Sequence, residues 1–156
     1  MILLVLRGLP GCGKSTLTED IMKKYQDAVI ISNDLLRISD NTYDYNINNN
    51  NEIYRLNYSN LINYIIEKKE LIIIDNCNLS FHILESYIEL SNKHGYKYIQ
   101  LKFPKPELKN LYENFKKSKK GLSFSNYKIM FTKYENHYLD KNINEYDIYS
   151  ILQQYL

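Results

Sequence analysis

The stretch that decides the fold covers residues 2–16 and reads ILLVLRGLPGCGKST. Its first five residues are all apolar, a run too short for a helix and typical of a strand buried on both faces of a parallel sheet. A glycine-rich loop follows at residues 8–13, and a helix is predicted from there to about Tyr25. A buried strand that runs through such a turn into a helix indicates the beginning of an α/β domain.

Strands and helices alternate along the rest of the chain. Further strands are predicted from apolar or alternating runs at residues 28–31, 71–74, 96–103 and 145–151. Further helices are predicted at residues 52–68, 81–94, 106–120 and 125–138, and a polar loop at 40–51. Strands separated by helices pack as a parallel sheet flanked by helices on both faces, so one α/β domain is predicted over residues 1–156.

The composition is that of an ordinary globular domain. The chain has 156 residues, of which 44% are hydrophobic and 24% charged, enough for one core. Two cysteines cannot make a disulfide framework, which favours a reducing, intracellular location, cytoplasmic or nuclear. No apolar run approaches the roughly 20 residues of a membrane span, so no membrane partner is expected. The net charge of +2 excludes no class of partner, and the oligomeric state stays open.

Residues 8–15, GLPGCGKS, match the phosphate-binding pattern G-x-x-x-x-G-K-[ST] at every fixed position. Glycines let backbone N–H groups turn inward around a phosphate, and the helix N-terminus adds partial positive charge. Lys14 is expected to bridge the β- and γ-phosphates, Ser15 to ligate Mg²⁺, and Thr16 to reach the α-phosphate. The motif predicts binding of ATP or GTP with Mg²⁺. The expected contacts are Gly8, Pro10, Gly11, Cys12, Gly13, Lys14, Ser15 and Thr16.

Asp34 and Arg37 follow the second predicted strand and are three residues apart, so one helical turn puts them on the same face. At the end of a parallel strand they would face the ligand cleft. There a carboxylate can accept the proton of an attacking hydroxyl, and a guanidinium can hold a substrate phosphate. The same spacing fits a helix N-cap made by Asn33 or Asp34, with Arg37 paired to Asp34 on the surface.

The third predicted strand ends in Asp75, which Asn76, Cys77 and Asn78 follow. A carboxylate at the end of an apolar strand is suited to holding Mg²⁺ or its water, and Asn76 and Asn78 could position a substrate. Because Asp and Asn also favour turns, a simple strand-ending turn explains the same residues.

Residues 102–128 hold eight lysines and two glutamates, a local charge of +6. Such a run is typical of a solvated helix face.

In order along the chain, these elements resemble the P-loop 5′-hydroxyl polynucleotide kinases and related small AAA-type kinase-like domains. Such domains occur in phage end-healing enzymes, tRNA ligases and NEDD4-binding-protein-2-like proteins. The resemblance rests on residues 8–15, the Asn33-Asp34-x-x-Arg37 element, residues 75–79 (DNCNL) and residues 111–117 (LYENFKK). It implies that Asp34 is the general base and that Arg37 holds the substrate phosphate. It also implies that the basic segment at about residues 105–125 is a helical lid that closes over ATP.

Two departures from that family concern the lid and the third strand. Where the family has a lid arginine, the matching residue here is Lys117, with Lys116 and Lys120 as rivals. A lysine offers a point charge rather than a planar fork, so it stabilises the transferring phosphoryl group less well. Cys77 stands where the family has threonine between two asparagines, which leaves no hydroxyl at that position.

The function that the resemblance implies is an ATP- and Mg²⁺-dependent kinase acting on 5′-hydroxyl ends of DNA or RNA. Tyr43, Tyr45, Tyr54 and Tyr58 follow the Asp-Arg element, where bases could stack on them, although tyrosine is frequent throughout the chain. Two alternatives stay open: a P-loop kinase for a nucleoside, sugar or antibiotic hydroxyl, and a low-turnover nucleotide-binding interaction module.

Overall fold

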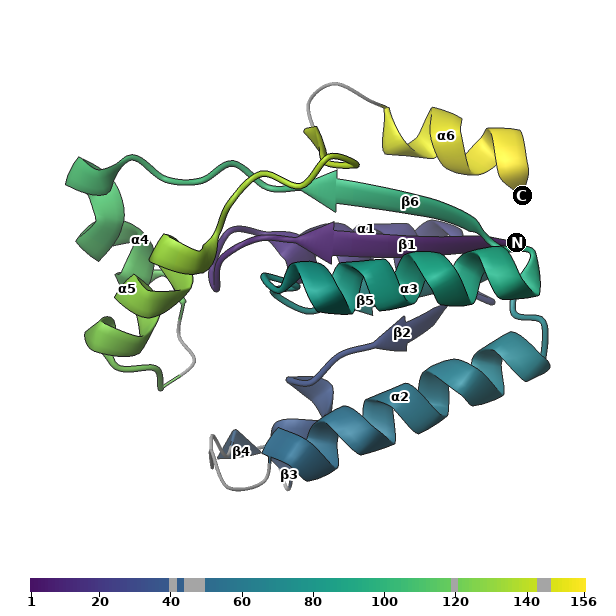
Figure 1. Ribbon diagram of the computed structural model, residues 1–156, viewed down its shortest axis with the longest axis horizontal. Coiled ribbons are helices and arrows are strands. Elements are labelled where there is room, and N and C mark those ends of the chain that lie inside the picture. Colours follow the sequence, from purple (N-terminus) through teal and green to yellow (C-terminus); the bar gives the residue numbers. More distant parts are fainter. Residues whose placement is uncertain (40–41, 44–49, 119–120, 143–146) are drawn as a thin grey trace.

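The computed structural model of the chain describes residues 1–39, 42–43, 50–118, 121–142 and 147–156. Its centre is a five-stranded sheet in the order β2-β5-β1-β6-β7, in which all neighbours run parallel (Figure 1). The strands are β1 (Ile2–Arg7), β2 (Val29–Ile31), β5 (Leu71–Asp75), β6 (Lys97–Lys102) and β7 (Lys141–Asn142). The predicted parallel α/β fold is confirmed.

The central strand is β1, and all six of its residues are buried. It pairs on one side with β5, where Leu3 lies opposite Ile72, and on the other with β6, where Leu3 lies opposite Tyr98. A strand with neighbours on both edges and helices on both faces has no solvent side, which explains the unbroken apolar run.

Helices cover both faces of this sheet (Figure 1). On one face α1 (Lys14–Lys24) and α6 (Ile148–Tyr155) pack against the even-numbered side chains of β1, including Leu4. On the other face α2 (Asn50–Ile66) and α3 (Phe81–His94) pack against the odd-numbered ones, including Leu3. Successive side chains of a strand point to opposite faces, so β1 contributes to both cores.

Two short helices, α4 (Leu111–Lys116) and α5 (Phe124–Lys133), stand apart from the sheet at its carboxyl end (Figure 1). We call these helices, with the 3₁₀ turn Leu108–Asn110 before them, the lid. The lid has its own apolar cluster, in which Leu111 and Tyr127 are buried together with Leu9 of the glycine-rich loop. The lid is therefore packed onto the loop that precedes α1.

The strand predicted at 145–151 is wrong, because the described part of that range belongs to helix α6. The Asp147 carboxylate accepts hydrogen bonds from the backbone N–H groups of Tyr149 and Ser150 and so begins the helix. Ile148 and Leu152, four residues apart, then pack on the sheet. The fifth strand is instead the two-residue β7, which pairs with Leu101 and Lys102.

The predicted helices of the lid are shorter than expected. Of the helix predicted at 106–120, only α4 is α-helical among the described residues, and the helix predicted at 125–138 ends at Lys133. After β2, a 3₁₀ turn (Leu35–Arg37) leads into an antiparallel pair, β3 (Ile38–Ser39) and β4 (Thr42–Tyr43). Most of the predicted loop at 40–51, with Tyr45, lies outside the described residues, as does Lys120.

The two ends of the sheet differ in what they carry. The carboxyl ends of β1, β2 and β5 face the lid and α2, whereas both chain ends lie at the opposite end of the sheet (Figure 1). Among the described residues, no helix is long and apolar enough to cross a membrane.

Candidate active site

The loop between β1 and α1 has the backbone that a phosphate cradle needs. Gly11 and Gly13 adopt φ angles of 80° and 101°, in the left-handed region that favours glycine. Gly13 is also the N-cap of α1, and its lack of a side chain leaves the first N–H groups of the helix without a side-chain cap. These N–H groups and the helix dipole together suit an anion.

Lys14 is buried against this loop. Its Nζ donates hydrogen bonds to the carbonyl oxygens of Gly8 and Leu9, each at 3.0 Å, and lies 3.7 Å from the Sγ of Cys12. Burial opposes the charge of Lys14, but Cys77, Cys12 and Asp75 outweigh it and raise the pKa of the ammonium. The lysine is therefore positively charged at neutral pH, as phosphate binding requires.

Ser15 and Asp75 are the magnesium ligands predicted from the sequence, and both carry side-chain oxygens. Ser15 and Thr16 are exposed in the first turn of α1, and Asp75 ends β5 opposite Leu6 of β1. Among the described residues no cluster of three or more His, Cys, Asp or Glu could hold a metal. This donor set fits Mg²⁺, which usually takes one or two protein ligands and completes its shell with water and phosphate oxygens.

Asp34 and Arg37 both lie at the carboxyl end of β2, in and next to the 3₁₀ turn. Arg37 is buried and donates through Nη2 to the Oδ1 of Asn50 at the beginning of α2. Asp34 precedes the turn, and its side chain makes no capping hydrogen bond there. Asp34 therefore does not cap this turn, and Arg37 is buried rather than on the surface as the alternative interpretation required.

Three asparagines connect the segments on this side of the site. The Oδ1 of Asn76 accepts from the backbone N–H of Asn33 at 2.8 Å, which joins the end of β5 to the end of β2. The Oδ1 of Asn33 accepts from Nδ2 of Asn57 on α2 at 2.5 Å. This asparagine chain fixes the backbone next to Asp34, a role for Asn57 that sequence reasoning missed.

Asn78 is placed differently from Asn76. It is buried, has a φ of 49°, and donates from Nδ2 to the carbonyl of Leu6 at 2.7 Å. Its own carbonyl accepts from Nε of Arg7 at 2.9 Å. Asn78 thus holds the end of β1, although it also lines the cleft described next.

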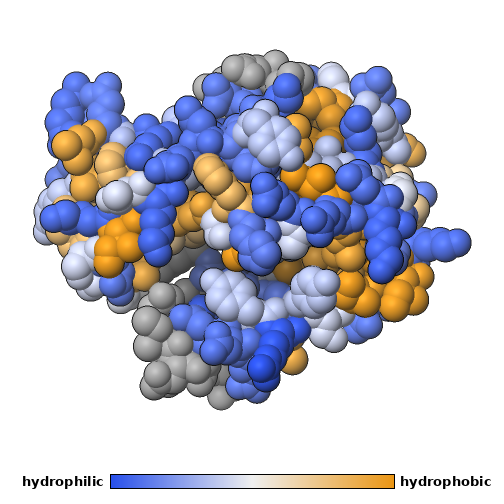
Figure 2. All heavy atoms as spheres, viewed as in Figure 1, coloured by the Kyte–Doolittle hydropathy of each residue, from blue (hydrophilic) through white to orange (hydrophobic). Residues whose placement is uncertain are grey.

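A large cleft of about 1410 Å³ opens between the lid, α2 and α3, and Figure 2 shows the surface hollowed between the lid and α2. It brings together most of the residues proposed from the sequence to act on an acceptor. These are Asp34, Arg37, Asn76 and Asn78, and the loop residues Pro10 and Lys14, predicted to contact the nucleotide, line the same cleft. The cleft is also lined by Arg55 and Lys133, which sequence reasoning did not single out.

Lys117, the predicted lid residue, lies beside the loop rather than along the large cleft. With Gly11 and Cys12 it lines a separate cavity of about 300 Å³. A Cβ built on Gly11 would lie 2.8 Å from the carbonyl carbon of Lys117 and 2.9 Å from the N of Ser118. The lid backbone therefore touches the loop at this glycine, and nothing larger fits there.

Arg7 is a buried cation directly before the loop, and sequence reasoning gave it no role. Its Nη1 donates to both carboxylate oxygens of Asp140, and Nη2 donates to the carbonyl of Glu135. Burial opposes ionisation of Asp140, but hydrogen bonds from His137 N–H and Arg7 outweigh it and lower the pKa of the carboxyl. A charged residue at the end of an apolar strand was the available signal, because buried charges need partners.

The fold and this site define a class. A parallel sheet flanked by helices, with a glycine-rich loop and a lysine between β1 and α1, is a P-loop kinase-like nucleotide-binding protein. The model of the family described as chromatin associated protein KTI12 matches residues 1–147. The chain belongs to the KTI12 family.

Individual relatives agree with this class. The chain is 34% identical to human NEDD4-binding protein 2 over 97 residues, which are 62% of this chain and 6% of that protein. Kti12 from Chaetomium thermophilum, solved in complex with ADP-AlF3, superposes with a TM-score of 0.67 at 16% identity, covering 98% of this chain and 94% of that one. A fungal RNA kinase gives a TM-score of 0.59 at 16% identity, covering 86% of this chain and 33% of that one.

These comparisons test the resemblance proposed from the motifs. The P-loop kinase fold and the likeness to NEDD4-binding protein 2 are confirmed. The chain spans a small part of that curated relative, and the structural matches are distant enough to show the fold alone. Activity on 5′-hydroxyl ends therefore stays a prediction.

Proposed function

We propose that this chain is an ATP- and Mg²⁺-dependent kinase domain that phosphorylates the 5′-hydroxyl of a DNA or RNA end. The observation that carries the proposal is one cleft lined by Lys14 of the phosphate-binding loop together with Asp34 and Arg37. A phosphoryl donor on the loop and an acceptor near Asp34 would share this space. The likeness to a fungal RNA kinase supports a nucleic acid as the acceptor.

In the proposed reaction the oxygen of the acceptor hydroxyl attacks the γ-phosphorus of ATP in line with the bridging oxygen. The new oxygen–phosphorus bond forms as the bond to the β–γ bridging oxygen breaks, and ADP leaves. The proton of the hydroxyl passes to the Asp34 carboxylate. A positioned base of this kind contributes roughly 10²–10⁴-fold to the rate.

Arg37 is suited to the phosphate that follows the acceptor nucleoside. Its guanidinium is buried and oriented by Asn50, so its fork is already fixed before an acceptor arrives. A preorganised arginine costs less to order on binding than a flexible one. It would select an acceptor that carries a phosphate near its free hydroxyl.

Positive charge around the transferring group comes from two sides in this proposal. Lys14 lies on the loop, and Lys117 belongs to the lid segment that touches Gly11. Ser15 and Asp75 would hold Mg²⁺, which when bound neutralises charge on the phosphates. The expectation that residues 105–125 act as a lid is part of the same proposal.

The test is transfer from γ-labelled ATP to matched 5′-hydroxyl DNA and RNA oligonucleotides, with Asp34→Ala and the matched control Asp27→Ala. Asp27 is an exposed turn residue between α1 and β2, away from the cleft. We expect label on the oligonucleotide, a loss of at least about 100-fold in Asp34→Ala, and no loss in the control. ATP affinity should be the same in all three proteins.

Full activity in Asp34→Ala would remove Asp34 as the base. If no oligonucleotide is labelled while ATP still binds, the proposal fails, and a small hydroxyl acceptor or a low-turnover binding module takes its place.

A further inference from the structure

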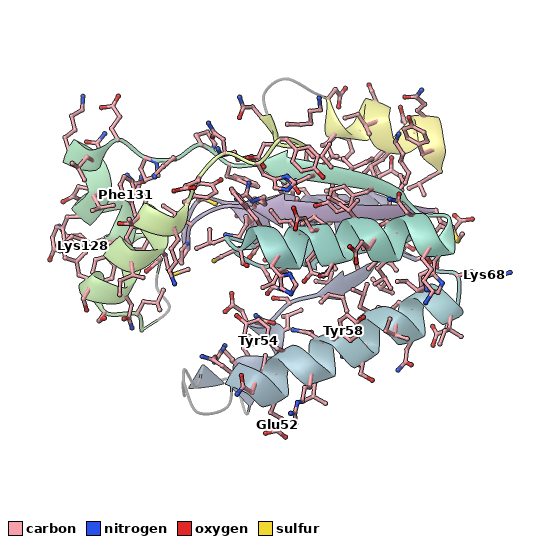
Figure 3. All side chains as sticks on the ribbon, viewed as in Figure 1. Glu52, Tyr54, Tyr58, Lys68, Lys128 and Phe131 are labelled. Carbon is pink, nitrogen blue, oxygen red and sulfur yellow. The ribbon has the colours of Figure 1, made fainter. Side chains whose placement is uncertain are left out.

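The large cleft extends well beyond Asp34 and Arg37, along the groove between α2 and α3. Tyr54, Tyr58 and Ile62 line one wall at intervals of four residues, so they form one stripe along α2. Figure 3 shows the Tyr54 and Tyr58 side chains on the side of α2 that faces the rest of the domain. The opposite wall comes from the first two turns of α3, including Ile83 and Tyr87. The groove is therefore lined by aromatic and aliphatic groups on both sides.

The two α2 tyrosines are accessible, unlike the tyrosine across from them. Tyr54 and Tyr58 are 52% and 54% exposed although they line a cleft. Tyr87 packs into the core under α3, and burial raises its pKa to about 12. Tyr54 and Tyr58 therefore leave about half of their surface open to whatever enters the groove, whereas Tyr87, in the opposite wall, is partly buried.

Charge along the same cleft suits a polyanion. Its lining includes the cations Lys14, Arg37, Arg55 and Lys133, and the acidic groups Asp34 and Glu135. Arg55 is adjacent in sequence to Tyr54, so a positive group and an aromatic ring occur together on α2. Aromatic rings next to a basic groove are the combination that binds single-stranded nucleic acid.

We infer that the acceptor is a single-stranded polynucleotide whose first bases stack on Tyr54 and Tyr58 while its first phosphates meet Arg37 and Arg55. This inference rests on the proposed function and specifies its substrate. The two tyrosines are four residues apart, about 6 Å along the helix, which leaves room for one base per ring. A base-paired end keeps its bases stacked within the duplex, so it cannot use these rings in the same way.

The test measures kcat/KM for 5′-hydroxyl acceptors of increasing length: a nucleoside 3′-phosphate, a trinucleotide, a hexanucleotide and a blunt duplex. We expect kcat/KM to rise from the nucleoside 3′-phosphate to the trinucleotide and to be lower for the duplex. In a Tyr54→Ala/Tyr58→Ala double variant, the ratio of hexanucleotide to nucleoside 3′-phosphate should fall at least about fivefold. Tyr54→Phe/Tyr58→Phe should recover most of that ratio, because phenylalanine keeps the ring.

The control is Tyr155→Ala, an exposed tyrosine of α6 away from the cleft, which should keep the wild-type ratio. Equal kcat/KM for the nucleoside 3′-phosphate and the hexanucleotide would overturn the stacking inference and leave the kinase proposal intact. If no acceptor is phosphorylated, the kinase proposal fails. Fluorescence anisotropy of a labelled hexanucleotide then tests whether the groove binds single-stranded nucleic acid. Binding that the double alanine variant weakens supports the groove, whereas absent or unaltered binding overturns it.

Discussion

Arg7 and Asp140, 133 residues apart in sequence, form a doubly hydrogen-bonded ion pair, with Nη1 2.6 and 2.7 Å from the two carboxylate oxygens. The Arg7 side chain is fully buried, and that of Asp140 is 9% exposed. Arg7 ends the strand before the phosphate-binding loop, and Asp140 lies in the segment that returns from the lid to the sheet. The pair therefore connects the loop and the lid through the core.

Removing one member of this pair should destabilise the fold strongly. We predict that Arg7→Met lowers the free energy of unfolding by about 3–5 kcal/mol, because it removes the two short hydrogen bonds to the buried Asp140 carboxylate and leaves only Lys102, at 3.6 Å, as a cation beside it. Urea denaturation followed by circular dichroism measures this. As a control, Lys23→Met breaks the exposed pair with Asp20 and should cost less than about 1 kcal/mol. Similar losses for both variants would contradict a special role for Arg7.

His137 should make the stability depend on pH. Burial, and then the charge of Arg7, lower the pKa of this histidine from its ordinary value of 6.5. Its Nδ1 also accepts from the N–H of Leu139. His137 therefore binds its proton at higher pH in the unfolded chain than in the folded one. Its contribution to the free energy of unfolding is fully present above about pH 6.5 and is lost as the pH falls through the lower pKa of the folded state.

We therefore predict that the midpoint of thermal unfolding falls between pH 7.5 and pH 5 and that His137→Asn reduces this fall. The Oδ1 of asparagine can replace Nδ1 as an acceptor but does not titrate in this range. Thermal scans at several pH values measure the difference. An equally steep pH dependence in His137→Asn would show that another group is responsible.

The contact between Gly11 and the lid can be tested with one methyl group. Gly11→Ala would add both backbone strain at a φ of 80° and a clash with the lid backbone at Lys117. We predict at least about tenfold weaker ATP binding, since either the loop or the lid must shift. Gly95→Ala is the matched control, because Gly95 has a φ of 72° but no atom within 4 Å of the added carbon. It should cost about 1 kcal/mol or more of stability and leave ATP affinity unchanged.

The two lid-region lysines should differ in which step they affect. Lys117 lies beside the loop and Lys133 lines the large cleft. We predict that Lys117→Ala lowers kcat about tenfold or more, because it removes charge near the transferring phosphoryl group. Lys133→Ala should instead raise KM for the acceptor. Steady-state kinetics with ATP and acceptor varied separately distinguishes the two, and an interchange of these effects would reassign the lid cation to Lys133.

The asparagine chain next to Asp34 should affect turnover rather than ATP binding. In Asn57→Asp the new carboxylate cannot donate to the Oδ1 of Asn33 and would repel it. We predict a lower kcat with unchanged ATP affinity and a loss of about 1–3 kcal/mol of stability. Calorimetric ATP titration together with the kinase assay measures this. A weakened ATP affinity with normal kcat would contradict the role given to Asn57.

Local patterns were enough to predict four of the five strands of the sheet and the phosphate-binding loop. The run at residues 2–6 and the pattern at 8–15 concern neighbours in sequence, and the buried strand and the left-handed glycines obey the same local rules. Helix α6 was missed because residues 148–151 fit a strand as well as a helix. The decisive signal was Asp147 before them, a side chain suited to an N-cap.

Contacts across the fold could not be predicted in this way. Arg7 and Asp140, and likewise Asn33 and Asn57, are paired by the order of the strands and by the return of the chain from the lid. Lys133, which lines the cleft, is the last residue of α5, and this helix ends five residues earlier than predicted. The sequence marks Arg7 as a charged residue at the end of an apolar strand, but only the tertiary structure shows which residues these side chains contact.

Both chain ends lie at the end of the sheet away from the cleft (Figure 1). A molecule tethered to a surface through either end would therefore hold its cleft outward, open to large ligands. The same arrangement lets a fluorophore or an affinity tag at either end report on the protein without blocking acceptor entry. Surface-immobilised binding experiments with long polynucleotides are thus compatible with the geometry of this domain.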